Sequence, residues 1–502
     1  MLLKVKTIDI VTGKKSVLLN EKDAKALDVR VHDRVSISKG GKTTVALVEI
    51  THTFVNPGEV GVFRDLVDDL SIVEGEELEV APTRTPSSVL YIRKKMRGGS
   101  LSRDEIYSIV RDVVNHALSE LELAAFLLAE EYLGMSMEET EHLTRAMAET
   151  GAMLDFGELV VDKHSIGGVP GNKVSLLIVP IVAAAGLKIP KTSSRAITSP
   201  AGTADTMEVL APVEFSAEEV KRIVRRVGGC IVWGGALNIA PADDIFIRVE
   251  YPLGIDPRPQ MLASILAKKL AVGAKVVVLD IPTGREAKVE TMEEARQLAQ
   301  EFVELGRRLG INIRCGITYG GQPVGYAVGP ALEAREALEA LHGKGPLSLI
   351  EKSVALAGLL MEEARTVPRG SGSQVARDIL QSGKALSKMK EIIEAQGGNP
   401  EITPDEIPVG NKHIVITSPI DGYITSISNY AIRSIARAAG APVDKGAGVL
   451  LHVKAGHVVK KDQPIMEIFA ERSVKLAEAQ SLFYTLKPVV IEGMLLDEFP
   501  SY

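Results

Sequence analysis

The chain has 502 residues, which is long enough for several domains and a sizeable hydrophobic core. Its hydrophobic content of 45% and charged content of 25% are ordinary for a globular protein. The net charge of −7 argues against a nucleic-acid partner, because nucleic-acid binders carry a basic surface. It also requires that any anionic substrate be attracted by local donors rather than by the overall field.

Residues 1–84 contain short apolar–polar alternations such as LLKVKTIDI and TTVALVEI, separated by Gly, Asn and Asp. Alternation with a period of two is typical of half-buried strands, so this segment predicts a β-rich N-terminal accessory domain, a small barrel. The first residues also lack the apolar region of a signal peptide. The segment contains no grouping that indicates catalysis, and we expect a role in assembly.

From residue 85 to residue 153 the apolar residues recur at steps of three and four, which predicts a helical domain. Ser102 with Glu105 has the spacing of a capping box at a helix N-terminus. A helical insertion at about residues 241–271 interrupts later strands. We expect this insertion to pack with the earlier helices as one discontinuous domain.

Residues 154–405, without that insertion, alternate apolar strands with amphipathic helices. The strand candidates are GCIVWGG, AKVVVLDIP and NIRCGITYG, which are rich in β-branched residues as in a buried parallel sheet. In such α/β domains ligands bind beyond the carboxyl ends of the strands. We therefore predict an α/β fold class, in which this domain binds phosphate and nucleotide.

Residues 406–502 return to a β-rich pattern and predict a C-terminal domain. The segments ITSPIDGYITSI and GHVVKKDQPIMEIFAE resemble the two halves of a lipoyl or biotinyl carrier domain, with Lys445 near the position of the prosthetic group. A helical stretch, SNYAIRSIARAAGAP, separates the halves, unlike in a carrier. A lid or interface role is therefore favoured.

The cysteines and the apolar runs indicate the compartment. Cys230 and Cys315 lie far apart and do not have metal-ligand spacing, which favours a reducing setting. No apolar run reaches membrane-spanning length. We expect a cytoplasmic protein without a membrane partner.

Two polar loops, Lys163–Lys173 and Ser193–Thr206, flank a predicted helix at Val174–Ala185. Glycines expose backbone N–H groups, hydroxyls add donors and a helix N-terminus adds positive charge, so such loops can bind phosphate. The loops match neither GxGxxG nor the P-loop pattern, because Asn172 and Val174 stand at the wrong places. Glycines alone would indicate only a tight turn, but Lys, His and Ser beside them favour an anion site.

The segments KHSIGGVPGNK, LLIVP, KTSSR and GTADTME resemble the corresponding segments of the pyrimidine nucleoside phosphorylases. That family shares its fold with anthranilate phosphoribosyltransferase: a helical domain beside a mixed α/β domain. The N-terminal extension, the second loop SSRAITSPAGT, EYPLGIDPRPQ and Val249 at the place of a ring-clamping arginine resemble the archaeal AMP phosphorylases.

The resemblance implies phosphorolysis of AMP, with CMP and UMP as further substrates, to free base and ribose 1,5-bisphosphate in nucleotide salvage. It implies a homodimer or larger homo-oligomer, and neither a metal nor another cofactor. Asp256 is implied as the catalytic acid that protonates the leaving base. An ordinary aspartate is ionised at neutral pH, so the proton would require burial, a neighbouring carboxylate or sharing with the base.

The resemblance also implies ligand contacts, among which Arg195 suits a bidentate bond to phosphate. Lys163 and Ser165 are expected to bind phosphate, although the sequence does not assign the 5′-phosphate and orthophosphate to particular loops. The expected substrate contacts are Gly168, Ser194, Arg195, Ala196, Ile197, Thr198, Ser199, Thr203, Ser264 and Lys288.

Two alternatives remain open at this point. One is a pyrimidine nucleoside phosphorylase that acts on thymidine or uridine and releases ribose 1-phosphate. The other is a carrier or scaffold without catalytic activity, which depends on a prosthetic group at Lys445. Glycine-rich loops alone do not decide among these functions.

Overall fold

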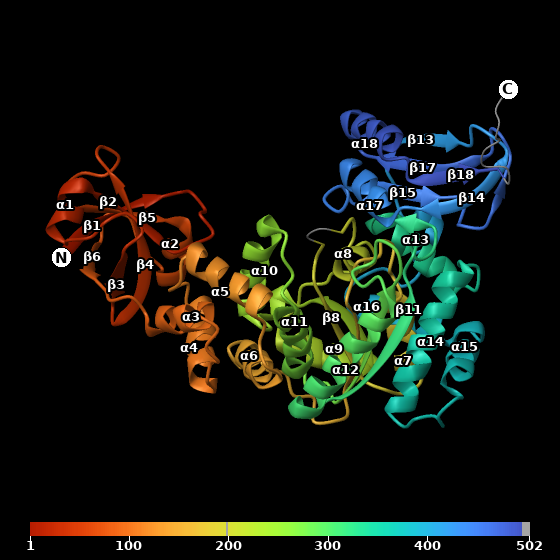
Figure 1. Cartoon of the computed structure of the whole chain (residues 1–502), viewed down its shortest axis with the longest axis horizontal. Helices are drawn as coiled ribbons and strands as arrows, with labels where there is room; N and C mark the ends of the chain where they lie inside the picture. Colours follow the sequence, from red (N-terminus) through yellow and green to blue (C-terminus); the bar gives the residue numbers. More distant parts are fainter. Residues whose placement is uncertain (197–198, 494–502) are drawn as a thin grey trace. The chain divides into compact units, whose positions relative to one another are not determined.

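The computed structural model describes residues 1–196 and 199–493, which divide into two compact units. Unit 1 comprises Met1–Gly151 and Ala240–Ala267, and unit 2 comprises Ala152–Ile239 and Lys268–Tyr502. Figure 1 shows the elements coloured along the chain. Within the described residues, no helix is both long and apolar enough to cross a membrane.

Unit 1 begins with six strands that close into a barrel in the order β1-β5-β2-β4-β3-β6 (Figure 1, red). Alternate apolar residues of these strands fill the barrel interior, as the period of two predicts. The strands are β1 (Leu2–Ile8), β2 (Ser16–Asn20), β3 (Arg34–Lys39), β4 (Lys42–Thr51), β5 (Glu59–Phe63) and β6 (Glu77–Pro82), with short helices α1 (Glu21–Ala26) and α2 (Arg64–Leu70) between them.

The rest of unit 1 is helical, and the later segment α10 packs against α4 and α5. Ser102 and Glu105 exchange the hydrogen bonds of a capping box at the start of α4, as predicted. The helices are α3 (Ser87–Met96), α4 (Arg103–Val114), α5 (Glu120–Leu133), α6 (Met137–Glu149), α10 (Pro241–Leu253) and α11 (Arg258–Ala271), the last of which continues into unit 2.

Unit 2 contains a parallel sheet of order β11-β10-β7 and a parallel pair β8-β9. The three apolar segments predicted as strands form β9, β10 and β11, so these predictions are confirmed. A parallel bridge between Val160 and Lys188 links the two groups. Their elements are β7 (Val161–Ser165), α7 (Ser175–Ala184), β8 (Ile189–Ser193), α8 (Thr203–Glu208), α9 (Ala217–Val227), β9 (Gly229–Trp233), a 3-10 turn (Gly235–Leu237), β10 (Val276–Thr283), α12 (Met292–Leu309) and β11 (Asn312–Tyr319).

Helices α12 and α14 both pack against β10 and β11, whereas α13, α15 and α16 pack against α7. Both helices on the sheet, α12 and α14, bury an apolar face and leave polar residues exposed. The helices are α13 (Pro330–Leu341), α14 (Leu347–Glu363), α15 (Gly372–Gln381) and α16 (Lys384–Ala395), followed by a 3-10 turn (Pro404–Glu406).

The C-terminal part of unit 2 has two antiparallel sheets, β12-β15-β17-β13 and β16-β14-β18 (Figure 1, mostly blue). Helices α17 and α18 pack against each other beside these sheets. The elements are β12 (Ala327–Val328), β13 (Lys412–Thr417), β14 (Gly422–Ile427), α17 (Asn429–Ala438), β15 (Gly448–Leu451), β16 (Val458–Val459), β17 (Pro464–Ala470), α18 (Ser473–Leu486) and β18 (Val489–Glu492).

Candidate active site

Strand β7 carries the first predicted phosphate-binding residues to the carboxyl edge of the sheet. The sequence predicted a loop from Lys163 onward, which is wrong for the first three residues. Lys163–Ser165 belong to the strand because they pair in parallel with Val278–Asp280 of β10. The glycine-rich loop therefore begins at Ile166, and Lys163 is buried beside the sheet while Ser165 is half-buried.

Asp280, on β10, organises the polar groups at this edge of the sheet. Its carboxylate accepts hydrogen bonds from Thr318 Oγ1 at 2.6 Å and from Asn172 Nδ2 at 3.1 Å. It also forms an ion pair with Lys352 Nζ at 3.0 Å. The same Asn172 amide donates to Ser165 Oγ at 2.9 Å, so the network reaches the predicted phosphate site.

This network was not predicted from the sequence, although one signal of it is present there. Asp280 is the charged residue near the carboxyl end of the otherwise apolar strand VVVLDIPT, and its side chain is fully buried. Burial raises the pKa of Asp280, but Lys352, Lys163 and the two hydrogen bonds outweigh it and lower the pKa below its usual value. An ionised carboxylate therefore faces the two lysines.

Lys163 and His164 both lose affinity for protons at this site. Burial lowers the pKa of Lys163 to about 8, although Asp280 opposes the shift. Burial also lowers the pKa of His164 well below its usual value, and Lys269 and Lys191 add to the effect. His164 is therefore neutral at pH 7, whereas Lys163 remains mostly protonated.

Gly168 and Lys288 are neighbours, although 120 positions separate them in the chain. A Cβ atom on Gly168 would lie 2.6 Å from the Lys288 backbone nitrogen and 2.8 Å from its Cβ. Gly168 also has a φ of +89°, which glycine adopts readily. The loop after β7 and the loop after β10 therefore approach so closely that only glycine fits at position 168. This approach brings the two predicted contacts together.

Asp205 of α8 holds the second predicted loop in shape. Its Oδ2 accepts hydrogen bonds from the backbone N–H groups of Ala196 at 2.7 Å and Gly202 at 3.0 Å. Ser194 is exposed, Ser199 and Thr203 are half-buried, and Thr203 is the first residue of α8. The predicted contacts Ile197 and Thr198 lie outside the described residues.

Arg195 is engaged with protein carboxylates. Its guanidinium forms two hydrogen bonds to Glu208, at 2.8 and 2.6 Å, and one to Glu214 at 2.8 Å. It also lies 4.9 Å from the centroid of the Trp233 ring. Protein carboxylates therefore use part of the guanidinium donors that a phosphate would contact, and the sequence pattern did not indicate these carboxylates.

The two remaining predicted residues belong to unit 1. Asp256 is exposed in the connection between α10 and α11, where Gly254 ends α10 with a left-handed conformation. Ser264 lies on α11 and is half-buried, between the buried residues Ala263 and Ile265. The side chain of Asp256 is therefore not buried, unlike in one of the arrangements expected from the sequence.

The fold and these loops define a glycosyltransferase with a helical domain and an α/β domain. Three family models match: "Glycosyl transferase family, helical bundle domain" over residues 89–151, "Glycosyl transferase family, a/b domain" over 157–386, and "Pyrimidine nucleoside phosphorylase C-terminal domain" over 423–487. Anthranilate phosphoribosyltransferase from Thermus thermophilus has a similar structure, with a TM-score of 0.52 and 23% identity over 61% of this chain and 98% of its own. These findings confirm the predicted fold class.

Curated relatives match over nearly the whole length. "AMP phosphorylase" of Thermococcus kodakarensis is 55% identical, and "AMP phosphorylase 1" of Archaeoglobus fulgidus is 54% identical, each over 99% of both chains. "AMP phosphorylase" of Methanococcoides burtonii is 51% identical over 100% of this chain and 99% of its own. The chain belongs to the AMP phosphorylase family.

The alternative of a carrier protein is not supported. Lys445, its proposed attachment point, forms ion pairs with Glu208 at 2.7 Å and with Asp205 at 3.5 Å. A carrier presents its lysine to a modifying enzyme, whereas this ammonium group contacts the α/β domain. The full-length relatives also favour the nucleotide substrate over the nucleoside alternative.

Proposed function

We propose that this chain catalyses the reaction of AMP with orthophosphate to give adenine and ribose 1,5-bisphosphate, in nucleotide salvage. The observation that carries the proposal is the identity of 51–55% with proteins named AMP phosphorylase over essentially the whole chain. Breaking the C1′–N bond places positive charge on the sugar and negative charge on the base. The site therefore requires an acid for the base and donors for two anions.

The assignment of residues is part of the same proposal. Lys163, Ser165 and Thr203 bind orthophosphate, and Asp256 protonates the leaving base. The nucleotide is bound by Gly168, Ser194–Ser199, Ser264 and Lys288. The proximity of Gly168 and Lys288 supports a common anion site, because it brings the glycine-rich loop after β7 next to the backbone of a lysine.

The product distinguishes this function from its rival. The chain, incubated with phosphate and AMP, CMP, UMP, adenosine or thymidine in turn, is expected to release base from the monophosphates. Mass spectrometry is expected to find ribose 1,5-bisphosphate. Release of ribose 1-phosphate from nucleosides alone would reject the proposal.

The affinity for phosphate is expected to fall as the pH rises through about 8. Lys163 is protonated below that pKa and neutral above it, so its attraction for phosphate is lost on the alkaline side. The KM for phosphate, measured between about pH 7 and pH 9.5, reports this loss. Arginine remains charged throughout this range, so Lys163→Arg should reduce the pH dependence; an identical profile would contradict the assignment.

We further propose a cytoplasmic homodimer or larger homo-oligomer. Exposed apolar side chains on α5, namely Leu121, Tyr132 and Leu133, support an interface on the helical domain. The unpaired Cys230 and Cys315 agree with a reducing compartment. Light scattering that reports a monomer would contradict the assembly.

A further inference from the structure

Helix α17 of the C-terminal domain contacts the loop after β10 through its first turn. Glu286, two residues before Lys288, accepts hydrogen bonds from Ser428 Oγ at 2.8 Å and from the backbone N–H of Tyr430 at 2.9 Å. The next side chain, Asn429, donates from Nδ2 to the carbonyl oxygen of Gly320 at 2.8 Å. The start of α17 therefore contacts the segments that follow β10 and β11.

The other end of α17 contacts the second loop of the candidate site. Arg437, in its last turn, donates from Nη1 to the carbonyl oxygen of Ser199 at 3.3 Å. Lys445, shortly after the helix, pairs with Asp205, whose carboxylate holds Ala196 and Gly202. The same helix thus reaches two of the loops that carry predicted substrate contacts.

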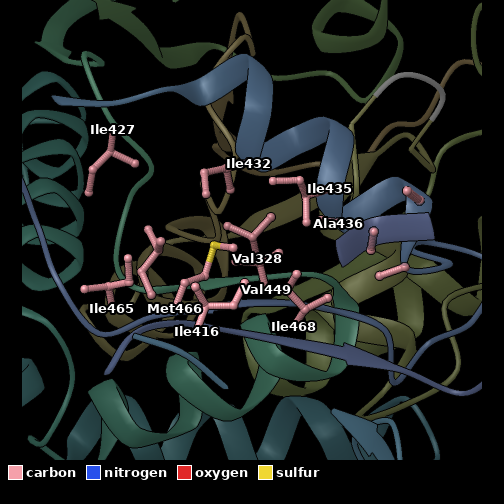
Figure 2. Close-up of a cluster of buried hydrophobic side chains, with 14 of the residues drawn as sticks. Val328, Ile416, Ile427, Ile432, Ile435, Ala436, Val449, Ile465, Met466 and Ile468 are labelled. Carbon is pink, nitrogen blue, oxygen red and sulfur yellow. The ribbon is translucent and has the colours of Figure 1, made fainter. Parts of the chain in front are cut away.

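The middle of α17 is fixed in the core of its own domain. Ile432, Ile435 and Ala436 are fully buried among side chains of the four-stranded sheet, including Val449 and Ile468. Figure 2 shows these helix residues facing that sheet. A helix embedded in this way cannot follow the movement of one loop without disturbing its own packing.

Glu286 has an unusual backbone conformation that requires support. Its φ is +59°, a left-handed value that is uncommon for residues other than glycine. The carboxylate accepts its two hydrogen bonds at the N-terminal end of a helix, where negative charge is favoured. These bonds hold the turn that leads directly to Lys288.

We propose that α17 and its N-cap Ser428 form a strap, which fixes the loop of Lys288 and the loop of Ser199 in their binding arrangement. Glu286 and Arg437 are then positioning residues, since they act through Lys288 and through the loop of Ser199. The consequence for substrate rests on the proposed function, but the restraint on the loops does not. The C-terminal domain therefore takes part in substrate binding, although it supplies none of the predicted substrate contacts.

Hydrogen–deuterium exchange on the full chain without substrate tests the strap. Glu286→Ala is expected to accelerate exchange in residues 284–290 by about 10-fold, because two bonds to a charged acceptor are lost. Glu286→Gln, which keeps an acceptor oxygen, should restore much of the protection. Arg437→Ala should accelerate exchange in residues 194–196 and 199–203.

The matched control is Glu406→Ala. Its carboxylate likewise accepts from a backbone N–H and a hydroxyl, both of Thr403 at 2.8 Å, but it supports a separate 3-10 turn. This variant should leave exchange at both loops unchanged. If Glu286→Ala fails to fold, Ser428→Ala can replace it, because it removes the hydroxyl at the start of α17 that donates to the Glu286 carboxylate. It is expected to have the same effect on residues 284–290.

Kinetics separates the strap from the proposed function. Glu286→Ala should raise the KM for AMP by about 10-fold with a smaller change in kcat, because it disturbs binding rather than the proton transfer. Exchange equal to wild type in residues 284–290 of the folded variant would overturn the strap, whatever the activity. Absence of AMP phosphorolysis in the wild type would instead reject the proposed function, and exchange would still decide on the strap.

Discussion

Asp256→Asn is expected to lower kcat for AMP phosphorolysis by about 10²–10⁴-fold, with a much smaller change in KM. Asparagine has nearly the same size and can still hydrogen-bond to the base. Its amide cannot transfer a proton to the leaving nitrogen, so adenine would have to depart as an anion. The loss therefore falls on the transition state rather than on substrate binding.

Initial rates of adenine release at saturating phosphate measure this effect. Asp104→Asn is the matched control, because Asp104 is also an exposed aspartate of unit 1, in the first turn of α4. It should retain wild-type kcat. A kcat within about threefold of wild type for Asp256→Asn would refute the acid assignment, since general acid catalysis contributes far more.

The dependence of the reaction on Asp256 can also be compared among substrates. The Asp256 side chain is exposed in the connection between α10 and α11. Comparing the loss of kcat on Asp256→Asn with AMP, CMP and UMP measures how strongly the release of each base depends on this acid.

Local patterns sufficed for the elements that carry the site. The apolar runs around Val276–Thr283 and Asn312–Tyr319 predicted buried parallel strands, and both strands lie in the parallel sheet. The pattern reached this result because a fully buried strand must be apolar on both faces. It failed at Lys163–Ser165, where a polar sequence suggested a loop, because ion pairs and hydrogen bonds allow a polar strand end to be buried.

Long-range polar pairs could not be predicted in this way. Arg195 had the right chemistry for phosphate, but nothing in its neighbourhood showed that Glu208 and Glu214 would engage it. Likewise, 142 positions separate Glu286 from Ser428. A charged residue that is buried and paired looks the same in sequence as one that is solvated, so such contacts become visible only in the fold.

The most consequential of these long-range pairs joins Asp162 to Lys269. Asp162 lies directly before Lys163 in the chain. Lys269 Nζ, in the last turn of α11, is 2.5 Å from Asp162 Oδ2, and both side chains are fully buried. The other carboxylate oxygen accepts the backbone N–H of Lys163 at 2.7 Å. The pair therefore fixes the start of the strand segment that carries the predicted phosphate ligands.

Lys269→Met is expected to destabilise unit 2 by about 3–5 kcal/mol, because it leaves a buried carboxylate without its cation. Adding Asp162→Asn should recover a large part of the loss, since the double variant buries no charge.

Differential scanning calorimetry measures the stability of both variants, with Lys475→Met as the control. Lys475 forms an ion pair with Glu478 at 3.2 Å on α18 with both side chains partly exposed, and its loss should cost less than about 1 kcal/mol. Equal destabilisation by the single and double variants would show that packing of the lysine stem, rather than the paired charge, stabilises this part of the site.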